Sequence, residues 1–356
     1  MSTQYWNTRK RLGKVHRIIL YIAVAACCFV LLSKFGYTGK TSNVGVRDRT
    51  EFGSRISPKS VIRRHNLNKL KSTPNAAKNK ERVLLISPMV RFEPAYWQNL
   101  LSLKYPRDLI DVVFILPRDN DGRDTEDKLR KAVADIQMNP PQTRFGKVTI
   151  LREDFQNRVA QDEKSRHKFE AQKERRSAMA RARNSALFTN LKPDVSWVLW
   201  LDTDIVETPA TLIEDLTAHN KSIIAPNVHQ KYRENGKILS RPYDFNNWID
   251  SQEAQNLAAT LGDDEILLEG YAELPTYRTL MAHLYDPAQD PKIEIELDGV
   301  GGAVLLVKAE VHRDGAMFPT FPFYHLIETE GFAKMAKRLN YQPYGLPHYL
   351  VFHINE

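Results

Sequence analysis

Two aspartates separated by one residue are the strongest chemical feature of the sequence. Asp202 and Asp204 directly follow the uninterrupted apolar run 197–201. So short a run is typical of a central strand in a mostly parallel sheet covered by helices, and such sheets bind ligands outside the carboxyl ends of their strands. Residues two apart on a strand point the same way, so both carboxylates could share Mg²⁺ or Mn²⁺, which prefer oxygen ligands. We therefore predict a site for a metal and a diphosphate, with Thr203 pointing elsewhere.

The alternative role for the two aspartates is to cap the helix that follows them. That helix has its own start signals, because Thr208 is a good N-cap residue and Pro209 suits the first helical position. The aspartates are then not needed as caps. The metal site is therefore the preferred interpretation.

Arg183 lies near the end of an expected long helix, 158–191, on its apolar side. Its neighbours three and four positions away are Met179, Ala180, Ala186 and Leu187. They place Arg183 on the stripe that faces the sheet, where an unpaired charge is costly. A substrate diphosphate or a buried aspartate would each serve as its anionic partner.

A glycine-rich segment forms a second candidate region. Asp298 precedes Gly301 and Gly302, which run into an apolar stretch ending at Lys308. Glycines let a backbone approach a ligand closely, and Asp298 stands where the chain would turn into the site. The alternative is a bulge or a tight turn.

Two glutamates and a histidine complete the set of candidates. Glu328 and Glu330 stand at the start of an expected helix, where either could orient or deprotonate a substrate hydroxyl, or simply interact favourably with the helix dipole. His353 lies on or near a short terminal strand. From the residues alone, such an isolated histidine is usually a packed or surface residue.

An alternation of strands and helices must position these residues. Strand-like runs occur at 82–88, 110–117, 147–151, 197–205 and 222–226, and helical stretches at 93–104, 124–137, 158–191 and 209–219. This order predicts an α/β fold with right-handed crossovers and a doubly wound, Rossmann-like, nucleotide-binding sheet. The glycine patterns of dinucleotide-binding and P-loop proteins are missing from the expected places.

The charge of the 356-residue chain is divided unevenly. The net charge is +8, but residues 1–80 hold 17 Lys or Arg and 2 acidic residues, whereas residues 81–356 hold 34 basic and 41 acidic residues. The basic character therefore belongs to a tail, which argues against a core that binds nucleic acid. The two cysteines, Cys27 and Cys28, are adjacent, so the rest of the chain has no disulfide framework or thiolate zinc site.

The N-terminus has the pattern of a type II membrane protein. Residues 18–33 are uncharged and follow five basic residues between 9 and 17. We predict a cytoplasmic tail (1–17), a transmembrane signal anchor (18–33), a flexible stem (34–80) and a lumenal domain (81–356). A cleaved signal peptide is the alternative for the apolar segment.

The motifs together resemble a known family. An anchor, a stem and an α/β domain with Asp-x-Asp after its central strand resemble a Golgi glycosyltransferase of the GT-A type. More closely, the chain resembles the fungal α-1,6-mannosyltransferases of the mannan polymerase complexes. The resemblance covers about residues 81–356, and five segments carry it: 179–184, 197–209, 298–302, 327–337 and 344–353.

This resemblance implies a function and a set of roles. It implies transfer of mannose from GDP-mannose, with Mn²⁺ and with retention of configuration, to the α-1,6-mannan backbone of N-linked glycans, by a subunit of a hetero-oligomeric complex in the Golgi membrane. It makes Asp202, Asp204 and His353 the metal ligands. Arg183 and Asn184 match a pair found ahead of Asp-x-Asp in many such enzymes, and we add Gly301 and Gly302 as candidates for nucleotide-sugar binding.

Two alternative functions come from other classes of protein. One is a largely non-catalytic scaffold subunit that keeps the fold and binds GDP or the acceptor. The other is a lumenal metal-dependent phosphohydrolase, which is less favoured because no second cluster of His and Asp ligands suggests a two-metal site. For the transferase, the sequence identifies no carboxylate nucleophile. Same-face attack on the donor is therefore at least as good an interpretation as double displacement.

Overall fold

The computed structural model describes residues 64–140, 143–154, 169–269 and 275–355. The predicted tail (1–17) and signal anchor (18–33) lie outside these residues, as does the predicted stem up to residue 63. Within the described ranges, no helix is both long enough and apolar enough to span a membrane.

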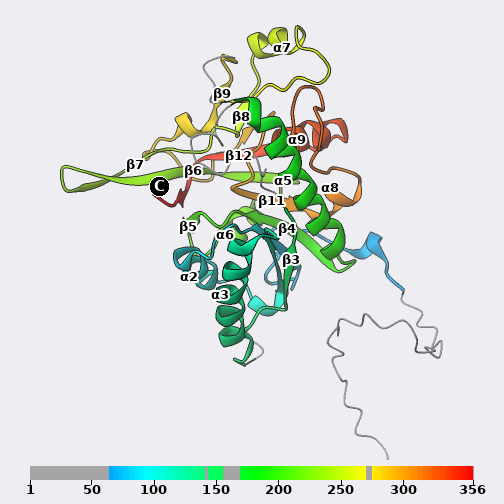
Figure 1. Cartoon of the computed structure of the whole chain (residues 1–356), viewed down its shortest axis with the longest axis vertical. Coiled ribbons are helices and arrows are strands. Elements are labelled where there is room, and N and C mark those ends of the chain that lie inside the picture. The colour runs from blue at the N-terminus through cyan, green and yellow to red at the C-terminus, as the bar shows by residue number, and fades with distance from the viewer. Residues whose placement is uncertain (1–63, 141–142, 155–168, 270–274, 356) are drawn as a thin grey trace, which may run out of the picture. The chain divides into compact units, whose positions relative to one another are not determined.

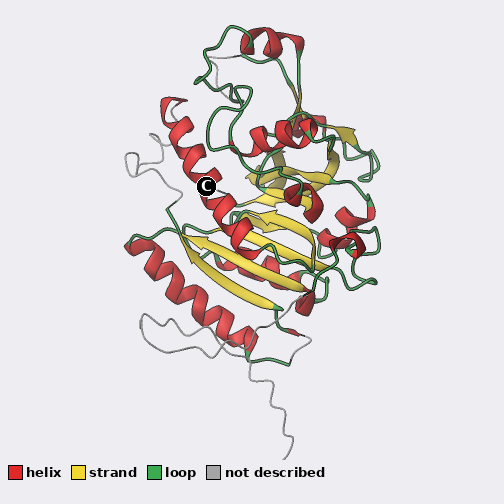
Figure 2. Ribbon diagram, turned by 90° about the vertical axis from the view of Figure 1, so that its right-hand side faces the viewer, coloured by secondary structure: helices red, strands yellow, loops and turns green. Residues whose placement is uncertain are grey.

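A mostly parallel sheet forms the centre of the described domain (Figures 1 and 2). Its strand order is β10-β12-β6-β11-β4-β1-β2-β3. The strands are β1 (Arg82–Pro88), β2 (Ile110–Leu116), β3 (Lys147–Arg152), β4 (Val195–Leu201), β6 (Ile223–Glu234), β10 (Ile295–Glu296), β11 (Val304–Lys308) and β12 (Pro343–His353). Strands β3, β2, β1 and β4 are parallel, β11 runs antiparallel between β4 and β6, and β12 is parallel to β6. The predicted mostly parallel α/β sheet is confirmed.

Helices cover both faces of this sheet. One face carries α2 (Pro94–Ser102), α3 (Asn120–Gln137) and α6 (Leu212–Ala218), and the other carries α5 (Phe169–Asn190), α8 (Ala309–Arg313) and α9 (Glu328–Arg338). Alternate residues of β1 enter the two cores, because side chains alternate across a strand. Val83 and Leu85 pack with the first group of helices, and Leu84 and Ile86 pack with the second. The two cores fix the sheet from both sides.

Strand β4 is buried along its whole length, as its apolar run predicts. It pairs with β1 in parallel and with β11 in antiparallel fashion. Its two tryptophans face opposite cores, Trp197 with the α2 side and Trp200 with the α5 side. Full burial of large apolar side chains contributes about 1.5–3 kcal/mol each, so the chain leaves this strand from a firmly held end.

A short strand carries the chain away from β4 and meets the end of β12. Strand β5 (Ile205–Glu207) pairs antiparallel with β12, and Ile205 lies opposite His353. In the same region Ile354 N donates to the carbonyl oxygen of Asp204 over 2.7 Å. The pairing therefore brings His353 next to the aspartates.

A long hairpin and a small second sheet complete the described fold. Strand β7 (Lys237–Pro242) pairs with the far part of β6, and the hairpin projects from the body (Figure 1). The chain then returns to the main sheet, where Tyr243 N donates to Val228 O over 3.1 Å. Beyond it lie β8 (Trp248–Ile249), α7 (Gln252–Ala258), β9 (Thr279–Leu280) and a 3₁₀ turn at Met281–Leu284. Two further 3₁₀ turns, Leu67–Lys69 and Arg107–Leu109, precede β1 and β2.

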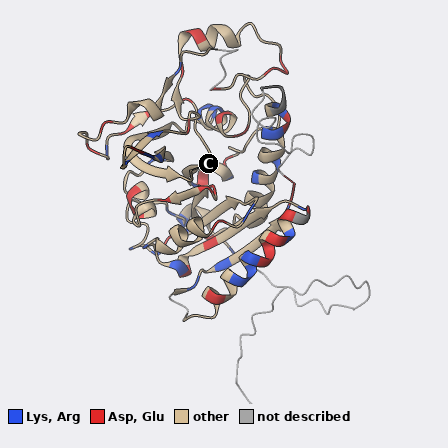
Figure 3. Ribbon diagram, turned by 60° about the vertical axis from the view of Figure 1, so that its left-hand side comes forward, with Lys and Arg blue, Asp and Glu red and all other residues tan. Residues whose placement is uncertain are grey.

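Charged residues of both signs are mixed over the described domain, as Figure 3 shows. On α3 they form pairs four residues apart, Asp124 with Lys128 and Glu126 with Arg130. Exposed pairs of this kind contribute only about 0.3–0.5 kcal/mol each. They suit a solvated helix face.

One helix start differs from the prediction. Helix α6 begins at Leu212, with Thr211 as its N-cap residue, so the predicted start at Thr208 and Pro209 is wrong. The backbone N–H and the hydroxyl of Thr208 both donate to Oδ1 of Asn99, over 3.0 and 3.1 Å. Asn99 lies on α2, and these hydrogen bonds hold Thr208 in the loop before α6. The expected helix 158–191 is described only as α5.

Candidate active site

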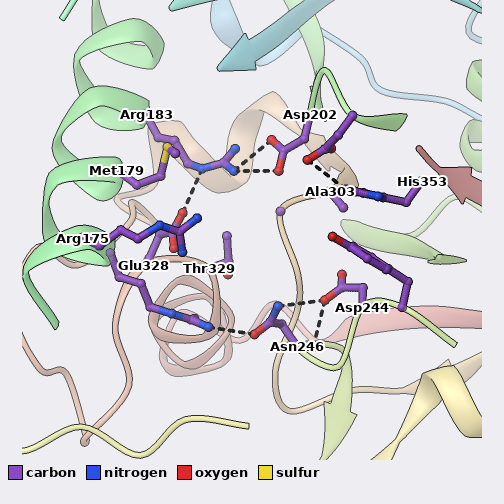
Figure 4. A pocket seen from close by; sticks show the side chains of 14 residues that line it. Arg175, Met179, Arg183, Asp202, Asp244, Asn246, Ala303, Glu328, Thr329 and His353 are labelled. Carbon is purple, nitrogen blue, oxygen red and sulfur yellow. Dashed lines mark hydrogen bonds and ion pairs between the residues drawn. The ribbon is translucent and has the colours of Figure 1, made fainter. Parts of the chain in front are cut away.

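A cavity of about 280 Å³ lies at the carboxyl end of β4. Most of its lining residues are polar or charged, and they come from six places: α5, the turn after β4, the segment after β7, the loop before β11, the start of α9 and the end of β12 (Figure 4). Small-molecule sites usually enclose about 300–1,000 Å³. The cavity is therefore large enough for part of a nucleotide sugar.

Asp202 and Asp204 both line this cavity, but not as residues of an extended strand. Strand β4 ends at Leu201, and Ile205 N donates to Asp202 O over 3.1 Å, which closes a turn around the pair. The expected strand geometry is corrected to a turn. Thr203 does point elsewhere, because its hydroxyl donates to Pro88 O over 3.1 Å.

His353 lies against Asp204 in a geometry that suits a metal ligand. Its Nε2 is 2.9 Å from Oδ2 of Asp204, and its Nδ1 is 2.7 Å from the carbonyl oxygen of Ile354. A carbonyl can only accept, so Nδ1 donates to Ile354 O, and Nε2 donates to the carboxylate of Asp204 in this arrangement. A cation that displaced the proton on Nε2 would be bound by the lone pair of that atom. The ring also stacks on Tyr243, with 3.8 Å between centroids and 20° between planes.

The chemistry of this donor set fits a divalent cation. Asp204 Oδ1 is buried and has no hydrogen-bond partner in the described part of the chain. Two carboxylates and a neutral imidazole are ligands that Mn²⁺ and Mg²⁺ accept. In the arrangement seen here, no three His, Cys, Asp or Glu side chains among the described residues are grouped so that they could hold a metal ion. The metal assignment of Asp202, Asp204 and His353 stays a prediction.

Arg183 is buried beside the aspartates, and its charge is shared between two carboxylates. Its Nη2 donates to Oδ1 of Asp202 over 3.0 Å, and its Nε donates to Oε1 of Glu328 over 3.1 Å. Of the two partners left open by the sequence, the structure shows the acidic one. Nη1 of Arg183 is buried without a hydrogen-bond partner in the described residues, so one donor remains for an anion in the cavity.

Burial, followed by neighbouring charges, shifts the pKa of Asp202. Burial disfavours its charged form and raises the pKa to about 7, although Arg183 acts in the opposite direction. The neighbouring charges of Asp204 and Glu328 raise it further. A bound cation would stabilise the ionised form of Asp202.

The two candidate glycines make room for side chains of the site. A Cβ atom at Gly302 would lie 2.6 Å from Nη2 of Arg183, and one at Gly301 would lie 1.9 Å from Oδ2 of Asp244. Both distances are far below a van der Waals contact. Gly302 lines the cavity, whereas Gly301 lies behind Asp244.

Glu328 and Glu330 have different surroundings, although both begin α9. Glu328 lines the cavity, and its φ of 55° is in the left-handed region that favours glycine. Glu330 has 0% exposure and faces the interior, where Oε1 is 3.6 Å from Nη1 of Arg176. Burial raises the pKa of Glu330 to about 7. The structure therefore places only Glu328 where a substrate could touch it.

Two other predicted site residues are engaged outside the cavity. Asp298 contacts Nζ of Lys337 and accepts from Asp250 N over 2.8 Å. Asn184 exchanges two hydrogen bonds with the backbone of Phe318, over 2.7 and 3.0 Å. Neither side chain lines the cavity. The predicted catalytic role of Asp298 and nucleotide-binding role of Asn184 stay predictions.

Several residues of the cavity were not singled out as site residues in the sequence, among them Arg176, Tyr243 and Asp244. Arg176 lies in a run of mixed charges, Tyr243 is one of many aromatic residues in 230–297, and Asp244 follows it without any local pattern. Arg176 donates to Oδ1 of Asn246 over 3.0 Å. A weak signal exists only for Tyr243, because aromatic and polar residues together are typical of sugar-binding clefts.

The fold and the cavity place the chain in a class of α/β proteins with Asp-x-Asp at the carboxyl edge of a mostly parallel sheet. More specifically, the chain belongs to the Anp1 family, whose model matches residues 61–322.

Relatives within this family are similar over most of the chain. The mannan polymerase complex subunit MNN9 of Candida albicans is 52% identical over 329 residues, which are 91% of this chain and 88% of the relative. The mannan polymerase complex subunit mnn9 of Schizosaccharomyces pombe is 56% identical over 292 residues, which are 82% of this chain and 86% of the relative. The predicted resemblance to the fungal mannan polymerase family is confirmed.

A solved structure is also similar, at a lower level. It is the mannosyltransferase PcManGT from Pyrobaculum calidifontis in complex with GDP-Man and Mn²⁺. The similarity covers 80% of this chain and 59% of that chain, with a TM-score of 0.40 and 14% sequence identity. This chain thus spans less than two thirds of the length of that protein.

Proposed function

We propose that the chain is a metal-dependent glycosyltransferase of the GT-A type. It transfers mannose from GDP-mannose to the α-1,6-mannan backbone of N-linked glycans, with retention, as a subunit of a mannan polymerase complex. It acts in the Golgi lumen, anchored through residues 18–33. Membership of the Anp1 family and the names of the two MNN9 relatives support the proposal.

One observation carries the chemical part of this proposal. Asp204 and His353 meet at the carboxyl end of the central strand, and His353 presents Nε2 because its Nδ1–H is bound to Ile354 O. Asp202, Asp204 and His353 would hold Mn²⁺ or Mg²⁺. Such a cation, when bound, neutralises the charge that develops on the leaving diphosphate.

The other residues of the cavity bind and orient. Arg183 offers Nη1 to a diphosphate oxygen while Asp202 and Glu328 fix its plane. Glu328 lines the cavity and would orient an acceptor hydroxyl by accepting a hydrogen bond from it. Because an α-linked donor gives an α-linked product, attack comes from the face that the diphosphate leaves.

The test uses the full-length chain purified in detergent. It is incubated with GDP-mannose, Mn²⁺ and α-1,6-mannobiose, and the mass and linkage of the product are determined. We expect an α-1,6-linked trimannoside, lost on chelation and reduced at least about 100-fold in Asp202→Ala and Asp204→Ala, since losing one group that stabilises developing charge costs about 10²–10³ in rate. Asp124→Asn, which changes an exposed carboxylate on α3, is the matched control.

Different results point to the alternatives. Full activity in Asp204→Ala would contradict the metal site. GDP binding without any product would favour the scaffold function, and release of phosphate from GDP without an acceptor would favour the phosphohydrolase.

A further inference from the structure

A third carboxylate of the cavity, Asp244, has no part in the proposed metal site. It lies in the segment after β7 and lines the cavity with only 7% of its surface exposed. Burial raises its pKa. Within the described residues no ion pair involves its side chain, so it differs from Asp202 and Asp204, which contact Arg183 and His353.

Neutral amides hold the carboxylate of Asp244. Its Oδ1 accepts from the backbone N–H and from Nδ2 of Asn246, over 2.9 and 2.8 Å. Its Oδ2 accepts from Nδ2 of Asn247 over 2.9 Å. A carboxylate has about four acceptor positions, so these bonds leave one, on Oδ2, for a ligand.

Further contacts fix these amides. Arg176 donates to Asn246, and Asn247 Oδ1 accepts from Gly301 N over 3.0 Å. Gly301 can lie this close only because it lacks a Cβ atom, which would overlap Asp244 Oδ2. The chain therefore orients Asp244 before any ligand arrives, which lowers the entropic cost of binding.

Its surroundings define the kind of ligand. A diphosphate would be repelled by the negative charge. A divalent cation collects several oxygen ligands, and this carboxylate has only one free acceptor position. The edge of guanine presents two donors where that one acceptor position remains. A single hydroxyl fits, because an O–H···O⁻ hydrogen bond is about twice as strong as a neutral one.

We infer that Asp244 binds one hydroxyl of a hexose in the cavity and thereby helps to select the sugar. This inference rests on the proposed function and names a specificity-determining residue for it. The hydroxyl belongs to the donor hexose or to the acceptor hexose. A sugar that lacks this hydroxyl leaves the buried acceptor on Asp244 unpaired. Sites of this kind discriminate most strongly between substrates.

The experiment compares full-length wild type with Asp244→Asn, which keeps the shape and removes the charge. With Mn²⁺ present, affinities for GDP and GDP-mannose are measured by calorimetry, and KM for α-1,6-mannobiose is measured in the transfer assay. Binding of methyl α-mannoside is followed by NMR, because that probe does not depend on a nucleotide. Asp124→Asn is again the control, and circular dichroism verifies folding.

The results separate donor from acceptor. A loss of about 10- to 100-fold in affinity for GDP-mannose, with unchanged affinity for GDP, assigns the contact to the donor hexose, as expected for a lost hydrogen bond to a charged group. Unchanged nucleotide affinities with a KM for mannobiose raised about 10-fold or more assign it to the acceptor. If the wild type binds methyl α-mannoside but neither nucleotide, the proposed function is contradicted. In that case, loss of methyl α-mannoside binding in Asp244→Asn still supports the inference.

Two results would overturn the inference. One is no change in any of these quantities, and the other is an equal loss for GDP and GDP-mannose, which would mean that Asp244 touches the nucleotide. If Asp244→Asn does not fold, Asn246→Ala replaces it. That variant keeps the carboxylate and removes one of its three hydrogen bonds, so the same selective loss is expected at about 3-fold, and an unselective loss or none overturns the inference.

Discussion

The two acidic walls of the cavity are held in opposite ways. On one wall, Asp202 and Asp204 contact charged or ionisable partners, Arg183 and His353. On the other wall, Asp244 contacts only neutral amides in the described structure. A bound cation or anion can replace a charged partner of the first wall. The amides of the second wall instead fix the orientation of the Asp244 carboxylate and leave it one acceptor position. The first wall is therefore suited to ions, and the second to a neutral polar ligand.

The largest effect on the free energy of unfolding should come from replacing Arg183 in the first wall. In Arg183→Met, the buried carboxylate of Glu328 and the partly buried carboxylate of Asp202 lose their shared cation, and removing one partner of a buried ion pair costs about 3–5 kcal/mol. The free energy of unfolding in guanidinium chloride measures this cost. Arg181→Met is the matched control, because Arg181 is exposed on the same helix and bonds only Ser177 among the described residues. If Arg183→Met and Arg181→Met had equal free energies of unfolding, the charged contacts of Arg183 would not distinguish the first wall from the second.

The support beneath the second wall should show in a pH dependence. Glu330 packs behind Arg176 with a pKa of about 7 in the folded state and about 4.5 when exposed. Between these values the unfolded chain loses a proton that the folded chain keeps, so stability falls as pH rises to about 7 and then levels off.

The variant Glu330→Gln cannot ionise and should not show this fall. Its free energy of unfolding relative to wild type should rise by up to about 3 kcal/mol between about pH 5 and about pH 8, since each pKa unit corresponds to about 1.4 kcal/mol. Denaturant titrations at both pH values measure it, with the exposed Glu253→Gln as control. A constant difference between Glu330→Gln and wild type would show that Glu330 is already ionised.

The smallest effect concerns the residue that joins the walls. Tyr243 precedes Asp244 and stacks on the ring of His353. Stacked aromatic pairs contribute about 0.5–1.5 kcal/mol beyond their buried area. A double-mutant cycle with Tyr243→Leu and His353→Ala should therefore give a coupling of about 1 kcal/mol in the free energy of unfolding. A coupling near zero would mean that the walls are independent.

The first wall could be predicted better than the second, for physical reasons. The apolar run of β4 and the alternation of strands and helices indicate the sheet, and the carboxyl end of a central strand indicates the position of the aspartates. Asp244 lies in a segment without periodicity. Its side chain is held by the nearby Asn247, which is itself fixed by a long-range hydrogen bond from Gly301. His353 became a candidate metal ligand only through the family resemblance.

The glutamates of α9 show how local geometry limits such predictions. Glu328 and Glu330 appear equivalent in the sequence, but successive helix residues turn by about 100°, so residues two apart face nearly opposite directions. One therefore lines the cavity and the other is buried behind it. Likewise, the antiparallel direction of β11 leaves no mark on its apolar pattern, because central strands of either direction are buried on both faces.

The left-handed backbone of Glu328 carries a strain that the ion pair of its side chain offsets. A non-glycine residue in this region costs about 1–2 kcal/mol, which glycine would avoid. Glycine, however, would remove the carboxylate that fixes Arg183 and faces the cavity. Removing one partner of a buried ion pair costs about 3–5 kcal/mol, which exceeds the cost of the backbone conformation. Selection of variants for thermal stability and selection for turnover would therefore both keep the glutamate at position 328.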